Sequence, residues 1–354
     1  MIPQQPARVH TIDVTECASD APELTWQQQL ADIIRTPEDL LAYLQLPSSL
    51  LNDAQRAADA FALRIPKAFA NRMIKGDVND PLLRQVLPLG EELAPPPAGY
   101  SLDPLGEVNA NAQPGVVHKY RSRVLLIVNS ACAVHCRYCF RRHFPYGDNQ
   151  LGLQQWQESL AYVKQQPQVN EIILSGGDPL SSNDTRLFKL LDMIEALPQI
   201  TRVRIHSRLP VVIPARLTDA LIARLAQSRL KVVLVIHANH QQELDTEVAL
   251  VLNKARQAGL HLLNQAVLLK GVNDTLSDQV ALSERLFELG VLPYYLHLLD
   301  PVVGAHHFDI PLQQAQQLHH DMQLALPGFL VPKLVRELAE HGSKTPIAPL
   351  VAPN

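Results

Sequence analysis

The stretch Val124-Leu-Leu-Ile-Val-Asn-Ser-Ala-Cys-Ala-Val-His-Cys-Arg-Tyr-Cys139 joins a short apolar run to three closely spaced cysteines. The apolar run predicts a buried strand, and the C-x3-C-x2-C spacing predicts a loop whose thiolates share one inorganic centre. Three thiolates are one fewer than a closed four-ligand iron–sulfur cluster uses. A 4Fe–4S cluster held by Cys132, Cys136 and Cys139 would therefore keep one iron open for a small molecule.

A disulfide or a zinc site fits these cysteines less well than a cluster does. A disulfide needs a paired cysteine and an oxidising compartment, and Cys17, which we interpret as an ordinary free thiol, lies in a polar N-terminal tail. Structural zinc usually takes four ligands, as separated cysteine or histidine pairs. His135 or His143 could complete a Cys3His site, which keeps zinc as the alternative to the cluster.

The composition of the 354-residue chain bounds its class. A hydrophobic content of 47% supports a sizeable core, and the length has room for one large α/β domain with a smaller appendage. A net charge of −4, with acids and bases mixed, argues against a nucleic-acid binder. No apolar run reaches the roughly 20 residues of a membrane helix, and no signal peptide is visible. We therefore expect a cytoplasmic protein, because reducing conditions suit a thiolate-bound cluster.

The N-terminal part predicts a helical region and then a linker. Residues 25–87 carry helix-spaced apolar residues, among them Leu30, Ile33 and Ile34, and Thr36-Pro-Glu-Asp39 is typical of a helix start. The run Leu93-Ala-Pro-Pro-Pro-Ala-Gly99 breaks this pattern. We expect three regions, which are the tail, helices and linker at 1–100, the core at 101–331 and a C-terminal segment at 332–354.

Strand-like apolar runs recur through the core, with amphipathic helix patterns between them. The runs are Val124–Val128, Glu171–Leu174, Val203–His206, Val232–His237, Leu262–Leu269 and Tyr294–Leu299. After the first interval they start about every 30 residues, which is typical of βαβ units and a parallel sheet. Six units are too few for a closed eight-stranded barrel, so the sequence predicts an α/β fold with an open, TIM-like (β/α)6 partial barrel. Chemistry in such folds gathers at the carboxyl ends of the strands.

Polar side chains near the first two of these strands indicate a ligand site. Ser175-Gly-Gly-Asp178 ends the second strand, where glycines let a ligand approach the backbone, although by themselves they indicate only a tight turn. Arg141 stays close to the cysteines, and its guanidinium could hold a carboxylate at two points. The segment Lys119–Arg123 is basic enough to receive a phosphate, or else it is a solvated edge.

Further polar residues lie at the ends of later strands or beyond them. His237 ends the fourth strand and Gln265 lies in the fifth, and a histidine near a strand end is often only a hydrogen-bonded structural residue. Asp300 is more telling, because an acid that follows an apolar strand needs a cationic partner at the mouth of the barrel. Lys344 lies in the short loop Gly342-Ser-Lys-Thr-Pro346 and, taken by itself, is a surface lysine.

Together these residues resemble the lysine 2,3-aminomutase family of radical S-adenosylmethionine (SAM) enzymes, most closely its branch that makes β-lysine for elongation factor P. The resemblance spans about residues 25–346. The segments that carry it are Asp80-Pro-Leu-Leu-Arg-Gln-Val-Leu87, Cys136-Arg-Tyr-Cys-Phe-Arg-Arg-His-Phe-Pro-Tyr146, Ile205-His-Ser-Arg-Leu-Pro210 and Leu330-Val-Pro-Lys-Leu-Val-Arg-Glu337.

The resemblance implies an isomerase that converts L-α-lysine to β-lysine with a 4Fe–4S cluster, SAM and pyridoxal 5′-phosphate (PLP). By resemblance, Cys132, Cys136 and Cys139 bind the cluster, and SAM chelates its fourth iron. Lys344 matches the lysine that holds PLP as a Schiff base. Reductive cleavage of SAM starts a radical reaction, and PLP carries the nitrogen that migrates from the α- to the β-carbon.

Other positions carry over from the same resemblance. Arg123 and Lys119 match contacts to the PLP phosphate. Arg141 matches the residue that holds the substrate carboxylate, and Asp300 and Glu337 match the two acids that recognise the distal ammonium. The expected contacts to SAM are Ser175, Gly176, Gly177, Asp178, His237 and Gln265.

Departures from the free-lysine mutases bear on these expectations. Glu337 stands where they have an aspartate, and Lys119 stands where they have an arginine. The chain also stops ten residues after Lys344 and has no cysteine there, whereas the free-lysine mutases continue into a cysteine-bearing zinc and assembly segment. We therefore expect no structural zinc, and a monomer or an oligomer smaller than theirs.

Alternative functions and partners complete the expectations. An aminomutase for another amino acid, such as glutamate, is disfavoured because Asp300 would repel an acidic side chain. A non-catalytic iron–sulfur or zinc-binding module would leave Lys344, Asp300 and the Gly-Gly turn without a joint role. The expected partners are lysine, a low-potential electron donor, elongation factor P and its lysine ligase, with no nucleic acid and no membrane.

Overall fold

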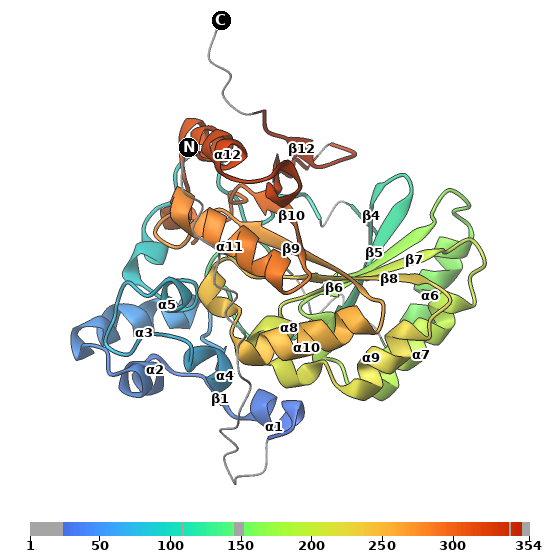
Figure 1. Ribbon diagram of the computed structural model, residues 1–354, viewed down its shortest axis with the longest axis horizontal. Coiled ribbons are helices and arrows are strands. Elements are labelled where there is room, and N and C mark those ends of the chain that lie inside the picture. The colour runs from blue at the N-terminus through green and yellow to red at the C-terminus, as the bar shows by residue number, and fades with distance from the viewer. Residues whose placement is uncertain (1–23, 108–109, 145–151, 340, 349–354) are drawn as a thin grey trace, which may run out of the picture.

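The computed structural model describes residues 24–107, 110–144, 152–339 and 341–348 (Figure 1). Cys17, expected to be a free thiol, lies outside these residues, as do Pro145 and Tyr146. The described chain is organised around a ten-stranded sheet whose strands follow the spatial order β12-β11-β10-β9-β8-β7-β6-β5-β4-β3. Strands that are neighbours in sequence are thus neighbours in space, as expected of successive βαβ units.

The centre of the sheet is parallel from β5 to β11. Its strands are β5 (Arg123–Asn129), β6 (Glu171–Gly176), β7 (Arg202–Ser207), β8 (Lys231–Ile236), β9 (His261–Val267), β10 (Leu292–His297) and β11 (Lys333–Arg336). The six predicted strands and the parallel α/β fold class are confirmed. β11 is a further parallel strand, so part of the region expected at 332–354 belongs to the same sheet.

Both edges of the sheet are antiparallel, which the sequence did not predict. At one edge, β3 (Asn111–Gln113) and β4 (Val116–Tyr120) form a hairpin against β5. At the other edge, the two-residue strand β12 (Thr345–Pro346) turns back on β11. This return places Lys344, which directly precedes β12, beside the residues that follow β11.

The helices that connect the parallel strands cover the outer face of the sheet (Figure 1). They are α6 (Leu153–Lys164), α7 (Asp184–Glu195), α8 (Leu209–Val212), α9 (Asp219–Ala226), α10 (Thr246–Gln257), α11 (Leu276–Glu288) and α12 (Leu312–Ala325). The 3-10 turns of this part are η4 (Pro179–Ser181), η5 (Pro214–Arg216), η6 (Gln241–Glu243), η7 (His306–Phe308) and η8 (Gly328–Leu330).

Local sequence signals explain where these helices begin. Asn183, Thr218, Asp245 and Thr275 each accept a hydrogen bond from a backbone N–H in the first turn of α7, α9, α10 and α11, respectively. Such capping side chains satisfy N–H groups that a helix start would otherwise leave without partners. The predicted apolar stripe Leu187, Leu190, Leu191 and Ile194 is buried along α7, which confirms that pattern.

The N-terminal region is mostly helical, as predicted. It contains α1 (Trp26–Ala31), α2 (Pro37–Leu44), η1 (Ser48–Leu50), α3 (Leu51–Ala60), α4 (Lys67–Ala70), α5 (Pro81–Arg84) and η2 (Gly90–Leu93). The helix start at Thr36 is confirmed, because Thr36 Oγ1 accepts a hydrogen bond of 3.1 Å from Asp39 N. The helical prediction was wrong for Ile33 and Ile34, which form β1 and pair with β2 (Ile65–Pro66). Both isoleucines are buried, and β-branched side chains suit an extended backbone.

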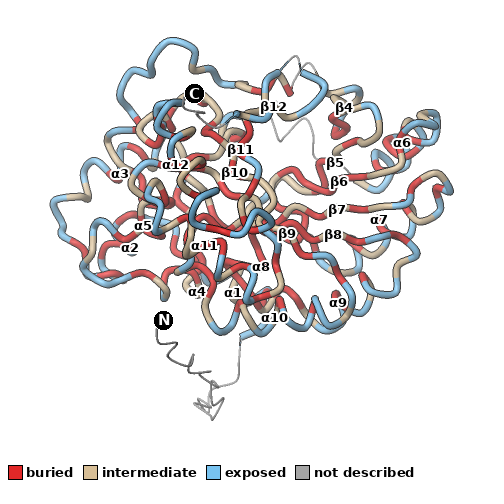
Figure 2. Tube along the Cα trace, turned by 45° about the horizontal axis from the view of Figure 1, so that its top comes forward, coloured by how far each residue is buried: buried red, intermediate tan, exposed pale blue. Residues whose placement is uncertain are grey.

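A continuous apolar core joins the N-terminal helices to the barrel. Buried side chains of the N-terminal region, such as Trp26 and Phe69, belong to the same cluster as Leu126 and Leu174 of the sheet. The elements α1 and η5 touch, as do α4 and α8. Figure 2 shows buried segments along the strands and exposed segments mainly at the outer loops. Among the described helices, none combines the length and the apolar character that crossing a bilayer requires.

Candidate active site

A cavity of about 250 Å³ is lined by the inner face of the sheet and by the loops that follow the strands. The loop after β5, the turn after β6, the residue that follows β8 and inward side chains of β7, β9 and β10 form its wall. The cofactor and substrate positions expected from the sequence all line this cavity. They are Lys119, Arg123, Cys132, Cys136, Cys139, Arg141, Ser175, Gly176, Gly177, Asp178, His237, Gln265, Asp300, Glu337 and Lys344.

The cysteines lie half-buried in a loop without regular structure directly after β5. Burial raises the pKa of the Cys139 thiol to about 11 and that of Cys132 above its usual value. Binding a metal centre would therefore release protons from these thiols. Among the described residues, no three His, Cys, Asp or Glu side chains are grouped to hold one metal ion. A four-iron cluster takes each thiolate on a different iron, so its ligands line a pocket without meeting at one point.

Backbone hydrogen bonds join the Gly-Gly turn after β6 to the start of the cysteine loop. Gly177 N donates to Asn129 O at 2.7 Å, and Asp178 N donates to Ala131 O at 2.9 Å. A Cβ on Gly176, whose φ is +119°, would lie 2.7 Å from Asn129 O, and one on Gly177 would lie 2.6 Å from Ala131 O. Only glycine fits such close approaches, so the turn is required to place the cysteine loop as well as to line the cavity.

Asp178 braces this turn against the loop after β7. Its Oδ1 accepts hydrogen bonds from Leu180 N at 2.9 Å and Ser207 Oγ at 2.7 Å. Its Oδ2 accepts from Arg208 N at 2.8 Å and Leu209 N at 3.1 Å. Burial raises the pKa of Asp178 although these hydrogen bonds act to lower it. The carboxylate expected to contact SAM is thus engaged by the protein itself, and it holds two walls of the cavity together.

Lys344 pairs with Glu337 in another part of the cavity wall. Its Nζ donates to Glu337 Oε2 at 2.6 Å and lies 5.6 Å from the centre of the Tyr295 ring. Glu337 Oε1 also accepts from Tyr120 OH at 3.1 Å and lies 3.7 Å from Lys119 Nζ. Burial acts to raise the pKa of Glu337, but the charge and hydrogen bond of Lys344 lower it below its usual value. Glu337 is therefore an ionised acceptor between two lysines.

The residues expected to receive a phosphate lie close to this cluster. Arg123 stacks its guanidinium 3.8 Å from the centre of the Tyr120 ring, a cation–π contact. Lys119 Nζ donates to Leu105 O at 2.7 Å. Arg204 of β7 lines the same cavity, and its buried Nε has no hydrogen-bond partner among the described residues. This side of the cavity therefore carries positive charge suited to an anion.

Asp300 is a half-buried residue whose carboxylate has one buried oxygen that is unsatisfied. It follows β10 and lines the cavity, and its Oδ1 has no hydrogen-bond partner within the described chain. Burial raises its pKa to about 7, although the positive charge of Lys344 acts against that rise. A buried acceptor of this kind is costly unless a cation or donor fills the space in front of it.

Arg141 already has a carboxylate partner in the protein. Its Nε and Nη2 donate to the two carboxylate oxygens of Glu107 at 2.6 and 2.7 Å. Its Nη1 donates to Ser175 Oγ and Gly176 O, both at 3.2 Å. The two-point grip that the sequence predicted for a ligand carboxylate is thus occupied here by Glu107. Glu107 was missed by sequence reasoning, because it is a single acid with no local motif around it.

Neutral histidines line the floor of the cavity. His237, directly after β8, contacts Gln265 of β9, so these two expected residues do lie together. Burial, with the charges of Arg208 and Lys344, lowers the pKa of His237 to about 3. His206 and His297, which sequence reasoning missed, are half-buried in the same cavity, and desolvation lowers their pKa values as well. The sequence feature that could have identified His206 and His297 is their position near the ends of β7 and β10.

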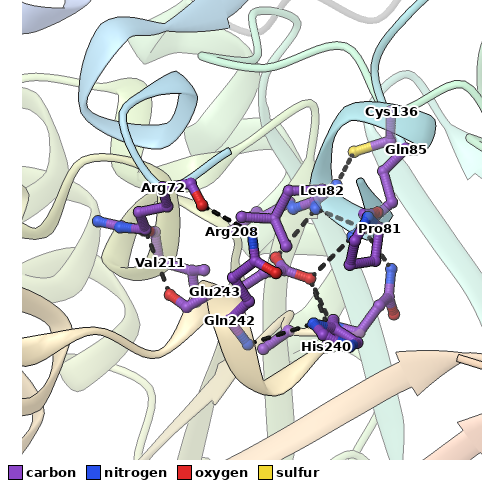
Figure 3. Close-up of polar contacts among 12 residues, drawn as sticks. Arg72, Pro81, Leu82, Gln85, Cys136, Arg208, Val211, His240, Gln242 and Glu243 are labelled. Atoms are coloured by element: carbon purple, nitrogen blue, oxygen red, sulfur yellow. Dashed lines mark hydrogen bonds and ion pairs between the residues drawn. The ribbon is translucent and has the colours of Figure 1, made fainter. Parts of the chain in front are cut away.

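Arg208 is a further residue that sequence reasoning missed. It belongs to the segment Ile205–Pro210, which was singled out without a role for its arginine. In the structure its Nη1 donates to Cys136 Sγ at 2.7 Å (Figure 3). A side chain from the loop after β7 thus touches a cysteine from the loop after β5.

Comparison with known proteins places the chain among radical SAM proteins. The model of the radical SAM superfamily matches residues 126–278. The protein named L-lysine 2,3-aminomutase from Escherichia coli K12 is 48% identical over 91% of this chain and 94% of its own length. The proteins of the same name from Haemophilus influenzae and Clostridium subterminale are 45% and 32% identical, over 91% and 94% of this chain and 95% and 79% of their own lengths.

Replacing Gly177 by alanine tests the close approach between the turn and the cysteine loop. The added Cβ must push away the Ala131 carbonyl, so we expect a loss of about 1–3 kcal/mol in unfolding free energy. Chemical unfolding measures that loss, and iron content after anaerobic reconstitution should fall with it. Gly328→Ala is the matched control, because no atom lies within 4 Å of a Cβ there. Equal stability of the two variants would contradict the assignment.

Asp300 should make the stability of the ligand-free protein depend on pH. Its pKa is about 7 in the folded chain but about 3.9 when unfolded. Between pH ~3.9 and pH ~7 a rise in pH removes the Asp300 proton only from the unfolded chain, so the free energy of unfolding falls. Above pH ~7 both states are ionised, and the loss stays constant.

Asp300→Asn cannot ionise and should escape this loss. We expect it to be more stable than the unmodified protein at pH 8, by on the order of 3 kcal/mol, with the difference closing toward pH 4. Urea unfolding of both ligand-free proteins at pH 8, 6 and 4.5 measures this. An asparagine variant that is less stable at pH 8 would show that Asp300 is not desolvated.

Proposed function

Because this chain belongs to the L-lysine 2,3-aminomutase family, we propose that it isomerises L-α-lysine to β-lysine, moving the amino group from the α- to the β-carbon. One observation carries the proposal. Three cysteines, a lysine that could bind an aldehyde, and an acid with a buried, unsatisfied oxygen all line one cavity.

The cysteine loop fits the cluster that the superfamily implies. We assign Cys132, Cys136 and Cys139 as ligands to three irons of a 4Fe–4S cluster, with SAM at the fourth. The cluster and SAM supply the one-electron chemistry that starts the reaction. The part played by the protein is to hold the cysteine loop through the Gly176–Gly177 turn and to keep the reacting groups inside the cavity.

The part of the cavity wall around Lys344 fits PLP, which supplies a carbonyl that can bind amino groups. We assign Lys344 as its covalent attachment point and Arg123 and Lys119 as contacts to its phosphate, with Arg204 nearby. Lys344 must lose a proton to solvent before its nitrogen can react, and Glu337, whose Oε2 lies 2.6 Å away, keeps its negative charge. The same loss of charge on Lys344 releases Glu337 from its ion pair.

The released Glu337 and Asp300 then explain a preference for lysine. We propose that both acids receive the distal ammonium of the substrate, which satisfies the unpaired Oδ1 of Asp300. Glu337 has a longer side chain than an aspartate at this position would have. In the structure it already binds a lysine ammonium, that of Lys344, so its carboxylate can serve such a group. A second carboxylate in the substrate, as in glutamate, would be repelled by this pair.

At the other end of the substrate, we assign Arg141 to the α-carboxylate. Its present partner Glu107 occupies the Nε and Nη2 edge of the guanidinium. A substrate carboxylate must therefore displace Glu107 or share Arg141 with it. Because Glu107 and the substrate carboxylate compete for Arg141, we expect the substrate carboxylate to be held by other groups of the cavity as well.

We also propose the finer assignments that follow from the sequence resemblance. The product would serve the modification of elongation factor P, with its lysine ligase acting on β-lysine. A low-potential electron donor would reduce the cluster, and the protein would act in the cytoplasm as a monomer or a small oligomer. The four resembling segments, among them Asp80–Leu87 and Ile205–Pro210, support this branch of the family.

The activity is tested by anaerobic reconstitution with iron, sulfide and PLP, followed by lysine, SAM and dithionite. Chiral mass analysis should find β-lysine. Removing one buried charge partner costs ~3–5 kcal/mol, so Asp300→Asn should lower turnover by roughly two to three powers of ten. Its iron and PLP contents should match those of the unmodified protein.

Asp59→Asn, a change to an exposed acid of α3 that accepts a hydrogen bond from Gln55, is the control and should keep full turnover. Near-normal turnover in Asp300→Asn would mean that the ammonium is recognised elsewhere. If the protein carries its full content of iron and PLP but forms no β-lysine, the proposed activity is wrong.

The site of PLP attachment is tested independently of turnover. Borohydride reduction of the PLP-loaded protein should leave a stable adduct, and peptide mapping should place it on Lys344. Lys344→Ala should trap none, whereas Lys333→Ala, a change to an exposed lysine of β11, should trap PLP normally. An adduct on Lys333 or Lys270 that persists in Lys344→Ala would refute the assignment.

A further inference from the structure

Arg208 is a buried arginine that places its charge on one of the three cysteines. Its Nη1 lies 2.7 Å from Cys136 Sγ and 2.7 Å from Tyr138 OH. The side chain is 6% exposed. Cys136 thus has a cationic hydrogen-bond donor, supplied by the loop after β7, which carries none of the expected cofactor or substrate residues.

Two further acceptors hold the guanidinium in this position (Figure 3). Arg208 Nη2 donates to Gln85 Oε1 at 2.7 Å and to Glu243 Oε2 at 3.1 Å. Glu243 Oε1 is itself held by Gln85 Nε2 at 3.1 Å and by the backbone N–H of Asn239 at 2.8 Å. Gln85 Oε1 also accepts from Asn239 Nδ2 at 2.9 Å. The acceptors around Arg208 are therefore fixed, and its orientation is determined before any cofactor binds.

A second buried arginine shows what an ordinary structural role looks like in this fold. Arg216 is fully buried and donates to Leu180 O at 2.6 Å and Ser182 O at 3.1 Å, with Asp184 at 2.9 Å. Its contacts thus fasten one loop to the next. Arg208 instead donates from Nη2 to the buried acceptors Gln85 and Glu243, and from Nη1 to the sulfur of Cys136. This difference indicates that the role of Arg208 is to interact with the sulfur of Cys136.

We propose that Arg208 is a positioning residue that acts through Cys136 and makes the 4Fe–4S cluster easier to reduce. The inference rests on the proposed function, which assigns Cys136 to the cluster. Reduction adds one electron from an external low-potential reductant and moves no proton, so negative charge on the cluster and its thiolates increases. A charge-assisted hydrogen bond to a ligand sulfur stabilises the reduced form more than the oxidised form.

The test compares Arg208→Met and Arg208→Lys with Arg216→Met, which removes another buried arginine whose contacts fasten two loops. Each protein is reconstituted with iron and sulfide and held without SAM, PLP or lysine. Iron content is measured first, and the midpoint potential is then found by a dye-mediated titration followed by electron paramagnetic resonance. This readout is independent of enzyme activity.

We expect both Arg208 variants to retain iron but to be harder to reduce. Arg208→Met should lower the equilibrium constant for reduction about tenfold, a shift of about 59 mV to more negative potential for one electron. Arg208→Lys keeps the charge without the fixed fork, so its shift should have the same sign and be smaller. Arg216→Met should match the unmodified protein in potential even if it is less stable.

Unchanged potentials in iron-loaded Arg208 variants would overturn the proposal. So would failure of both variants to hold iron while Arg216→Met holds it, because Arg208 would then only build the loop. If Arg208→Met does not fold, Arg208→Lys decides the question by the sign of its shift. An unmodified protein that binds no 4Fe–4S cluster would overturn the proposed function itself, an outcome distinct from an unchanged potential.

Discussion

Parallel pairing of successive strands is the constraint on which the rest of the molecule depends. Because β5 to β11 pair in sequence order and point the same way, the segments that follow them meet on one side of the sheet. The cysteine loop after β5 and Lys344 beyond β11 can line one cavity only through this arrangement. The helices between the strands keep the sheet covered, so the inner face is left for chemistry.

Charge compensation is the second constraint, because a buried charge without a partner is strongly destabilising. In the structure, Glu337 pairs with Lys344, Glu107 with Arg141, and Glu243 with Arg208. Each of these pairs involves a group expected or proposed to serve a cofactor or the substrate. The protein thus satisfies its own charges in the cavity, and Asp300 Oδ1 is an oxygen for which no described residue provides a donor.

The N-terminal region supports the cysteine loop and Arg208 from outside the barrel. Gln85 follows α5, and it reaches both Arg208 and Glu243. Arg72 donates to the backbone carbonyls of Glu243 and Val211, the latter shown in Figure 3. Gln242 Nε2 donates to Arg72 O and to Asp80 Oδ2, which extends the network to Asp80. The backbone N–H of Arg137, next to Cys136, also donates to Gln85 O at 2.9 Å. The N-terminal helices therefore help to position the cysteine loop.

The sequence by itself determined the six central strands, the cysteine loop and the Gly-Gly turn, and its resemblance to a known family brought Lys344 and Asp300 into one site. These features are carried by local periodicity, by residue spacing or by motifs, all of which can be read without knowing distant contacts. Only the tertiary structure decided that Ile33 and Ile34 pair with β2, that β11 joins the sheet, that Glu107 holds Arg141 and that Arg208 holds Cys136. Each of these depends on partners far apart in the chain, brought together by burial and hydrogen bonding, and such pairings leave no local pattern in the sequence.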